Sequence, residues 1–168
     1  MTIREEHGAL FVTEPLFTAD PEVVEALKQR ALASPRQSCR LCVHRDNDQP
    51  VLEALVAASP AATRPPHTHP GRYETDLILE GEVTAFFFDK DGAVVRRIDL
   101  GPPGGGKPFC LSTGPGHWHM IVFRSETVVY YEIIAGPYVD DILTWADWAP
   151  APDDVDGIAE FVKRSEAP

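Results

Sequence analysis

The chain has 168 residues, of which 43% are hydrophobic and 24% are charged. A chain of this length buries about 70% of the surface that its unfolded form exposes, which excludes intrinsic disorder and low-complexity polymers. Asp and Glu (26) outnumber Lys and Arg (15), which gives a net charge of −11. Because this charge repels phosphate backbones and no basic stripe offsets it, we expect no nucleic-acid partner.

The sequence also predicts a cytoplasmic protein with no membrane partner. No apolar run approaches the roughly 18 residues of a membrane helix, and residues 1–7 lack the apolar core of a signal peptide. The three cysteines, Cys39, Cys42 and Cys110, give no disulfide framework. If Cys39 and Cys42 lie on a strand, they point to opposite faces and do not share a metal easily.

A helix is predicted after residue 20 and another near the C-terminus. Asp20 suits the N-cap, Pro21 suits the first helical position, and Ser34-Pro35 ends the first helix. The apolar face of this helix carries Val23, Val24, Ala26, Leu27 and Ala31. A short amphipathic helix is predicted over Asp153–Ser165.

Between the helices the hydrophobic period changes to two, which predicts strands. We expect them at Arg40–His44, Val51–Ser59, Thr75–Leu79, Glu82–Asp89, Val94–Leu100, Pro108–Ser112, His117–Arg124 and Thr127–Ala135. Lys90-Asp91-Gly92 predicts a hairpin connection, and Gly101–Gly106 predicts a surface loop whose role as a lid stays open. Eight short strands predict an all-β sandwich, jelly roll or barrel. We expect one compact domain: an extension with a helix over 1–38, a barrel over 39–150, and a helix and tail over 151–168.

Four of the six histidines form two H-x-H pairs, His67/His69 and His117/His119. Residues two apart on a strand share a face, so each pair can direct two imidazoles at one point. Glu74 follows His69 after a Pro-Gly turn that can bring its carboxylate back beside the imidazoles. Imidazole and carboxylate are common metal ligands, so the pattern predicts a metal centre.

The spacing of these residues resembles the two motifs of the cupin superfamily. Pro66-His67-x-His69-x4-Glu74-x6-Gly81 is similar to the first motif, and Gly114-Pro115-Gly116-His117-Trp118-His119 is similar to the second. The resemblance implies a double-stranded β-helix, the cupin jelly-roll barrel, with a helix at each end. It also implies four metal ligands, His67, His69, Glu74 and His119, with His117 as an additional histidine.

Outside these motifs the chain resembles the WbuC-type cupin-fold metalloproteins. The similarity runs from about Leu16 to Pro150 and includes Arg40–His44, Glu132–Tyr138 and Trp145–Pro150. Members of that family often belong to surface-polysaccharide gene clusters, and their reaction is not established. The resemblance thus implies a fold and a metal, with a hint of the pathway. The chain departs from it at Asp76, where an apolar aromatic residue is expected.

Three imidazole nitrogens and one carboxylate oxygen leave two positions open on an octahedral ion. This donor set suits Fe, Mn, Co, Ni or Cu, whereas Zn more often takes fewer ligands, and Mg and Ca prefer oxygen. We therefore expect one divalent transition metal (Fe, Mn, Ni, Zn, Co or Cu). The open positions admit water, a bidentate hydroxy-ketone or α-hydroxy acid, or O₂ when the ion is Fe(II).

Two acids are candidate catalytic residues, Asp76 and Glu132. By strand parity Asp76 shares the face of Glu74, so we hypothesise that it is a general base or orients the substrate, with His117 as its partner in the pocket. Alternatively, a bulge after Glu74 turns Asp76 outward. Glu132 either reaches the cavity or pairs with an arginine such as Arg40 or Arg72.

These features predict a small metalloenzyme acting on a small polar metabolite, either a sugar derivative or a hydroxy or keto acid. The reaction is an isomerisation, an epimerisation or an Fe(II)-dependent dioxygenation. A non-catalytic binding or sensing module, and a purely structural metal, remain alternatives. Because sheet edges and exposed apolar faces commonly pair, we expect a homodimer.

Overall fold

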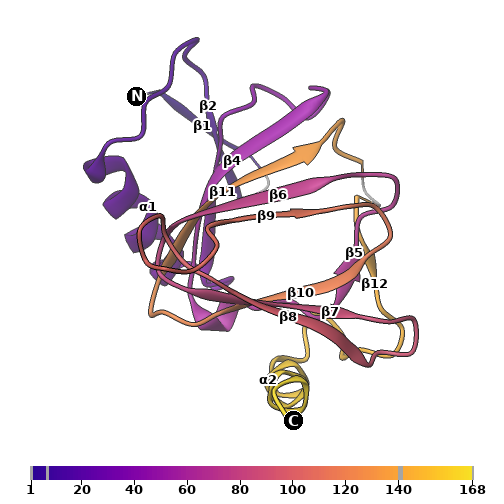
Figure 1. The fold of residues 1–168 in the computed structure, drawn as a ribbon. Coiled ribbons are helices and arrows are strands. Elements are labelled where there is room, and N and C mark those ends of the chain that lie inside the picture. The colour runs from indigo at the N-terminus through magenta and orange to yellow at the C-terminus, as the bar shows by residue number, and fades with distance from the viewer. Residues whose placement is uncertain (1, 7, 140–141, 168) are drawn as a thin grey trace.

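The strands form two sheets that face each other and close a barrel, as Figure 1 shows for the computed structural model. The structure describes residues 2–6, 8–139 and 142–167. In this part of the chain no helix is long and apolar enough to cross a membrane.

The larger sheet has seven strands and the smaller sheet has five. In spatial order the large sheet contains β1 (Ile3–Glu6), β2 (Ala9–Val12), β3 (Ser38–Cys42), β4 (Val51–Ala58), β11 (Val128–Ala135), β6 (Glu74–Glu80) and β9 (Cys110–Thr113). The small sheet contains β12 (Thr144–Trp145), β5 (His67–Thr68), β10 (Trp118–Phe123), β7 (Val83–Phe88) and β8 (Val94–Leu100). A short 3-10 helix, η1 (Pro60–Ala62), follows β4. All neighbours pair antiparallel except β2 and β3.

Helix α1 (Pro21–Ala33) covers the outer face of the large sheet. It begins where the sequence predicts, because the Asp20 side chain accepts a hydrogen bond of 2.9 Å from the Val23 backbone N–H. Its buried residues Leu27 and Ala31 belong to an apolar cluster that includes Leu41 and other outward-facing residues of β3 and β4. The helix therefore closes the outside of this sheet and leaves the inside for the barrel.

Helix α2 (Val155–Ser165) covers the outer face of the small sheet; in Figure 1 it lies below β7, β8 and β10. Its Phe161 packs against Phe88 of β7 and Trp148, with ring centroids 5.6 Å and 6.0 Å away. Trp148 belongs to the segment that precedes the helix, so the aromatic contacts hold the C-terminal part of the chain on the barrel.

The interior of the barrel has an apolar end and a polar end. At the apolar end the two sheets join through Ala58, Ile78, Val83, Ala85, Leu100 and Val128, all buried. Farther along the same strands, the interior positions of β6 and β11 change to Glu74, Asp76 and Glu132. The alternation also places Cys39 against the α1 cluster and Cys42 on the opposite face, so the two thiols do not share a site.

The all-β class, the double-stranded β-helix and both helices are confirmed. Each of the eight predicted strands is present, with ends displaced by two residues or fewer. The sequence missed β1, β2, β5 and β12. β1 is exposed along its whole length, and β5 and β12 are two residues long, so none of these three has a hydrophobic alternation of its own. The structure places β1 and β2, from the predicted N-terminal extension, in the large sheet.

Gly81, between β6 and β7, is expected to tolerate no side chain. Its φ is +76°, and a Cβ there would lie 2.7 Å from the Thr127 carbonyl oxygen. We expect Gly81→Ala to lower the free energy of unfolding by about 3 kcal/mol, because left-handed strain adds to a backbone clash. Gly104 also has a positive φ but open space around it, so Gly104→Ala carries only the strain. Urea denaturation of both variants checks this, and equal losses would contradict the clash.

Candidate metal centre

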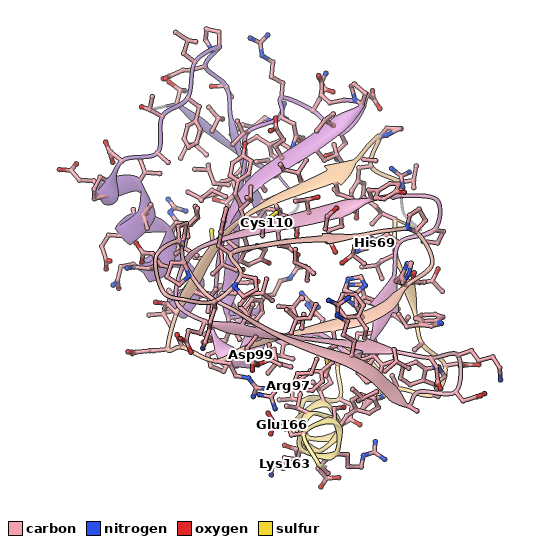
Figure 2. The ribbon with its side chains drawn as sticks, viewed as in Figure 1. His69, Arg97, Asp99, Cys110, Lys163 and Glu166 are labelled. Carbon is pink, nitrogen blue, oxygen red and sulfur yellow. The ribbon has the colours of Figure 1, made fainter. Side chains whose placement is uncertain are left out.

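The two sheets bring the four predicted ligands together at the polar end of the barrel. His67 on β5 lies directly opposite His119 on β10, with ring centroids 4.5 Å apart. His69 follows β5, and its ring centroid lies 5.3 Å from that of His67. Glu74 begins β6 in the opposite sheet. In Figure 2 His69 lies between the sheets. One nitrogen from each of the three histidines lies within 4.8 Å of the other two.

In each of the three histidines the Nδ1 atom lies within hydrogen-bond distance of a backbone carbonyl oxygen. The distances are 3.0 Å from His67 to Pro65, 2.9 Å from His69 to Ile142 and 3.0 Å from His119 to His117. A neutral imidazole that donates from Nδ1 carries its free lone pair on Nε2. Such backbone contacts fix the ring and the tautomer of metal-binding histidines. The three Nε2 lone pairs are therefore available to a cation.

The contacts of Glu74 fit a bound cation. Its two carboxylate oxygens lie 3.1 Å from His119 Nε2 and 3.3 Å from His69 Nε2. The His69 Nε2 atom is buried and makes no well-formed hydrogen bond. Carboxylate oxygens and imidazole lone pairs repel each other at such distances unless a proton or a metal ion lies among them. The structure thus brings the four predicted residues together, and His67, His69, Glu74 and His119 would hold a metal ion.

The pKa directions follow from burial and from these contacts. Burial, together with nearby His119, lowers the pKa of His67 to about 3, so this ligand is neutral at physiological pH. Burial alone would lower the pKa of His69 and raise that of Glu74. Contact with Glu74 outweighs burial at His69, so the pKa of His69 is raised. Contacts with His119 and with His69 hold the pKa of Glu74 well below its usual range.

A second cluster joins Glu74 to Asp76 and Glu132, and one carboxylate oxygen of each lies within 4.8 Å of those of the other two. Asp76 is 8% exposed and faces inward like Glu74, because the pairing of β6 is regular at these positions and the bulge lies at Val129/Tyr130. Burial raises the pKa of Asp76 well above its ordinary value, and Glu74 and Glu132 add to this effect. No hydrogen bond to its side chain is found in the described part of the chain. The outward alternative is thus excluded.

Glu132 combines both of its expected roles. It lies opposite Asp76 in the β6–β11 pair, and it also forms a two-pronged ion pair with Arg40, at 2.8 Å and 2.9 Å. Burial raises the pKa of Glu132, and the Arg40 guanidinium opposes the rise. The other arginine considered, Arg72, donates instead to the backbone carbonyl of Ala135.

The expected partnership of His117 with Asp76 is not found. β10 begins at Trp118, and His117 lies exposed in the turn before it, with Nδ1 3.2 Å from the carbonyl oxygens of Gly114 and Pro115. Strand parity applies only within a strand, so it did not place His117 beside its neighbour in the H-x-H pair.

Sequence reasoning missed two aromatic residues of this site. Tyr130 shares the inner face of β11 with Glu132, and its pKa is raised well above the ordinary value by burial and by the Glu132 and Asp76 carboxylates. Parity along the strand could have identified it. Trp145 lies beside His67, with ring centroids 5.4 Å apart, because β12 pairs with β5. No local sequence signal predicts that pairing.

Comparison with known proteins supports this fold. A family model described as a domain of unknown function (DUF6016) matches residues 19–100, and no curated protein matches the chain. An uncharacterised conserved protein with a double-stranded β-helix domain from Klebsiella pneumoniae has 18% identity and a TM-score of 0.52, covering 80% of this chain and 98% of that chain.

Two further solved structures are similar over a smaller part of the chain. KdgF from Halomonas sp. has 16% identity and a TM-score of 0.49, covering 64% of this chain and 86% of that chain. The cupin domain of Schizosaccharomyces pombe Cnp3 has 13% identity and a TM-score of 0.47. That match covers 59% of this chain and 64% of that chain, so the chain spans somewhat less than two thirds of the Cnp3 domain.

The chain therefore shares the double-stranded β-helix fold of the Klebsiella pneumoniae protein. Within this fold, the cluster of His and Glu side chains is a possible metal site.

Proposed function

We propose that the protein is a small metalloenzyme that moves a proton on a polar metabolite, in an isomerisation or epimerisation of a sugar derivative or of a hydroxy or keto acid. The proposal rests on one observation, the buried and unpaired environment of Asp76. The residue is 8% exposed, and its carboxylate has no hydrogen-bond partner among the described residues although it lies beside Glu74. Leaving a buried carboxylate unpaired is costly, and such groups cluster at functional sites.

The residues of the barrel divide the work between binding and proton transfer. The three histidines and Glu74 would hold a metal ion, which would supply Lewis acidity to a carbonyl group of the substrate. The Asp76 carboxylate accepts the proton from the adjacent carbon and returns it to the substrate, so the reaction needs no oxidant or co-substrate. Arg40 holds Glu132 in place, and Glu132 in turn accepts a hydrogen bond from a substrate hydroxyl group.

The resemblance to WbuC-type proteins supports a sugar derivative as the substrate and surface-polysaccharide synthesis as the pathway. A cytoplasmic location and a homodimer belong to the same proposal. All of these refine the metal-binding cupin that the fold and the cluster support.

Metal content is the first test. Elemental analysis of the tag-free protein is expected to find about one transition-metal ion per chain. The double variant His67→Ala/His119→Ala is expected to contain none, because it loses two of the four ligands. His117→Ala is the matched control and is expected to keep the metal, since His117 lies exposed outside the cluster. Equal metal content in all three proteins would refute the site.

Proton exchange tests the chemistry. Metal-loaded protein is incubated in D₂O with small sugars and hydroxy-ketones, and NMR follows the incorporation of deuterium at carbon. We expect exchange that Asp76→Asn slows by roughly 10²–10⁴-fold with the metal retained, as for the loss of a general base. Asp48→Asn, at an exposed acid, is the control. Oxygen uptake by the iron-loaded protein without exchange would favour a dioxygenase, and neither activity would favour a binding module.

A further inference from the structure

A second cavity lies outside the barrel, between α2 and the small sheet. It is a groove of about 450 Å³, lined by α2, by η1 and the residues after it, and by the end of β10. Its apolar surface includes Phe123 of β10 and Ile158, Ala159 and Val162 of α2. None of its lining residues belongs to the metal centre. Pockets for small organic ligands commonly have this size and a mostly apolar lining.

The charge of the groove is opposite to that of the protein. The described residues that line it include four bases, Arg36, Arg64, Arg124 and Lys163, and no Asp or Glu. The whole chain has 26 acidic residues against 15 Lys and Arg. Another groove, beside α1, is lined by the three acids Glu14, Asp20 and Glu22 and one base. Positive charge is therefore concentrated at one apolar groove of a strongly acidic molecule.

Three of these four cations have no ion pair with the described residues. Arg124 pairs with Glu166 and donates to Thr84. For Arg36, Arg64 and Lys163 the described residues provide no ion pair and no side-chain hydrogen bond. Figure 2 marks Lys163 of α2 and Glu166, which follows the helix, outside the barrel.

Several other cations of the protein have partners. The lysines at positions 28, 90 and 107 each form an ion pair with a carboxylate. Arg30, Arg45 and Arg96 have no ion pair among the described residues either, so the feature that distinguishes the groove is that several cations line one apolar surface without any acid.

We propose that this groove binds a small amphiphilic anion, an alkyl or aryl chain that ends in a carboxylate or phosphate. The chain lies against Phe123, Ile158 and Val162, where it removes apolar surface from water. The anionic head is held by Arg64 and Lys163, which form charge-assisted hydrogen bonds with it, whereas the Arg36 guanidinium lies beside Gly8 and adds only longer-range attraction. The volume of the groove and its cations together favour such a ligand over a neutral lipid, because a neutral lipid would leave Arg64 and Lys163 unpaired.

Titration calorimetry with octyl phosphate, octanoate, 1-octanol and inorganic phosphate tests the proposal. We expect saturable binding of octyl phosphate or octanoate, and at least about tenfold weaker binding of 1-octanol and of inorganic phosphate, because each lacks one of the two recognised parts. Comparing octyl phosphate with octanoate identifies the preferred head group. Binding is also expected to weaken as salt is added.

Variants locate the binding. Arg64→Ser/Lys163→Ser is expected to weaken binding about tenfold or more, whereas Arg45→Ser/Arg96→Ser, which removes two exposed cations elsewhere, leaves it unchanged. Ala159→Phe fills the groove from an exposed helix position and is expected to abolish binding without unfolding the protein.

Three results would overturn the proposal. The first is equal affinity for 1-octanol and octyl phosphate, and the second is an equal loss in the two double variants. The third is the absence of saturable binding. If the protein is then also a dimer that Ala159→Phe converts to a monomer, the groove is the contact surface for a second copy of the chain.

Discussion

Removal of the metal is expected to lower the melting temperature by about 8–16 °C. An ion that binds only the folded chain stabilises it by about 4 kcal/mol when its concentration is 1,000 times Kd, and in a domain of this size each kcal/mol is worth about 2–4 °C. The effect is large because, without a cation, the Glu74 carboxylate faces buried imidazoles at 3.1 Å and 3.3 Å. Thermal melts in a chelator, followed by readdition of single metals, measure the shift.

Two variants separate this effect from unrelated metal binding. His119 is 1% exposed, and His119→Ala is expected to lose the metal-dependent shift. His117→Ala is expected to keep it, because this histidine contacts only the carbonyl oxygens of its own turn. A protein that melts at the same temperature with and without every metal tested would show that the four residues do not form a functional metal centre.

Arg40→Met is expected to lower the free energy of unfolding by about 2–3 kcal/mol. It leaves Glu132, 7% exposed, without its cation and next to Asp76 and Glu74. Removing one partner of a fully buried pair costs about 3–5 kcal/mol, and the smaller value applies here because the Arg40 side chain is 44% exposed. Urea denaturation measures the loss.

A double-mutant cycle tests the physical cause. Glu132→Gln in the Arg40→Met background removes the unpaired charge and is expected to restore most of the lost stability. The exposed pair of Lys107 and Glu82 is the control, with an expected coupling below about 1 kcal/mol. If the Arg40 and Glu132 variants were simply additive, the guanidinium would not be neutralising the carboxylate cluster.

The cluster of candidate metal ligands was predictable because the H-x-H pattern and the return of Glu74 after a turn are local in sequence. His67 and His69 are two residues apart, and strand pairing then needs only to bring His119 opposite His67. His117 shows the limit of the same rule, because the exact start of β10 decides which histidine of the pair faces inward. If β10 began one residue earlier, at His117, strand parity would direct both histidines to the same face.

The surroundings of the metal centre depend on contacts between distant segments. Arg40 reaches Glu132 across 92 positions of the chain, and His69 contacts the Ile142 carbonyl across 73. The two-residue strand β12 exists only because β5 offers it an edge. Sequence patterns give periodicity within an element, whereas these contacts follow from how the elements are ordered in the sheets.

The position of Trp145 gives the protein an optical signal of its own. Its ring lies 5.4 Å from the ring of His67, while Trp118 and Trp148 pack against each other outside the barrel. An ion with a partly filled d shell quenches the emission of an indole so close to it, whereas Zn, with a filled shell, does not. Intrinsic fluorescence therefore distinguishes classes of metal in the intact protein, without a substrate and without a label.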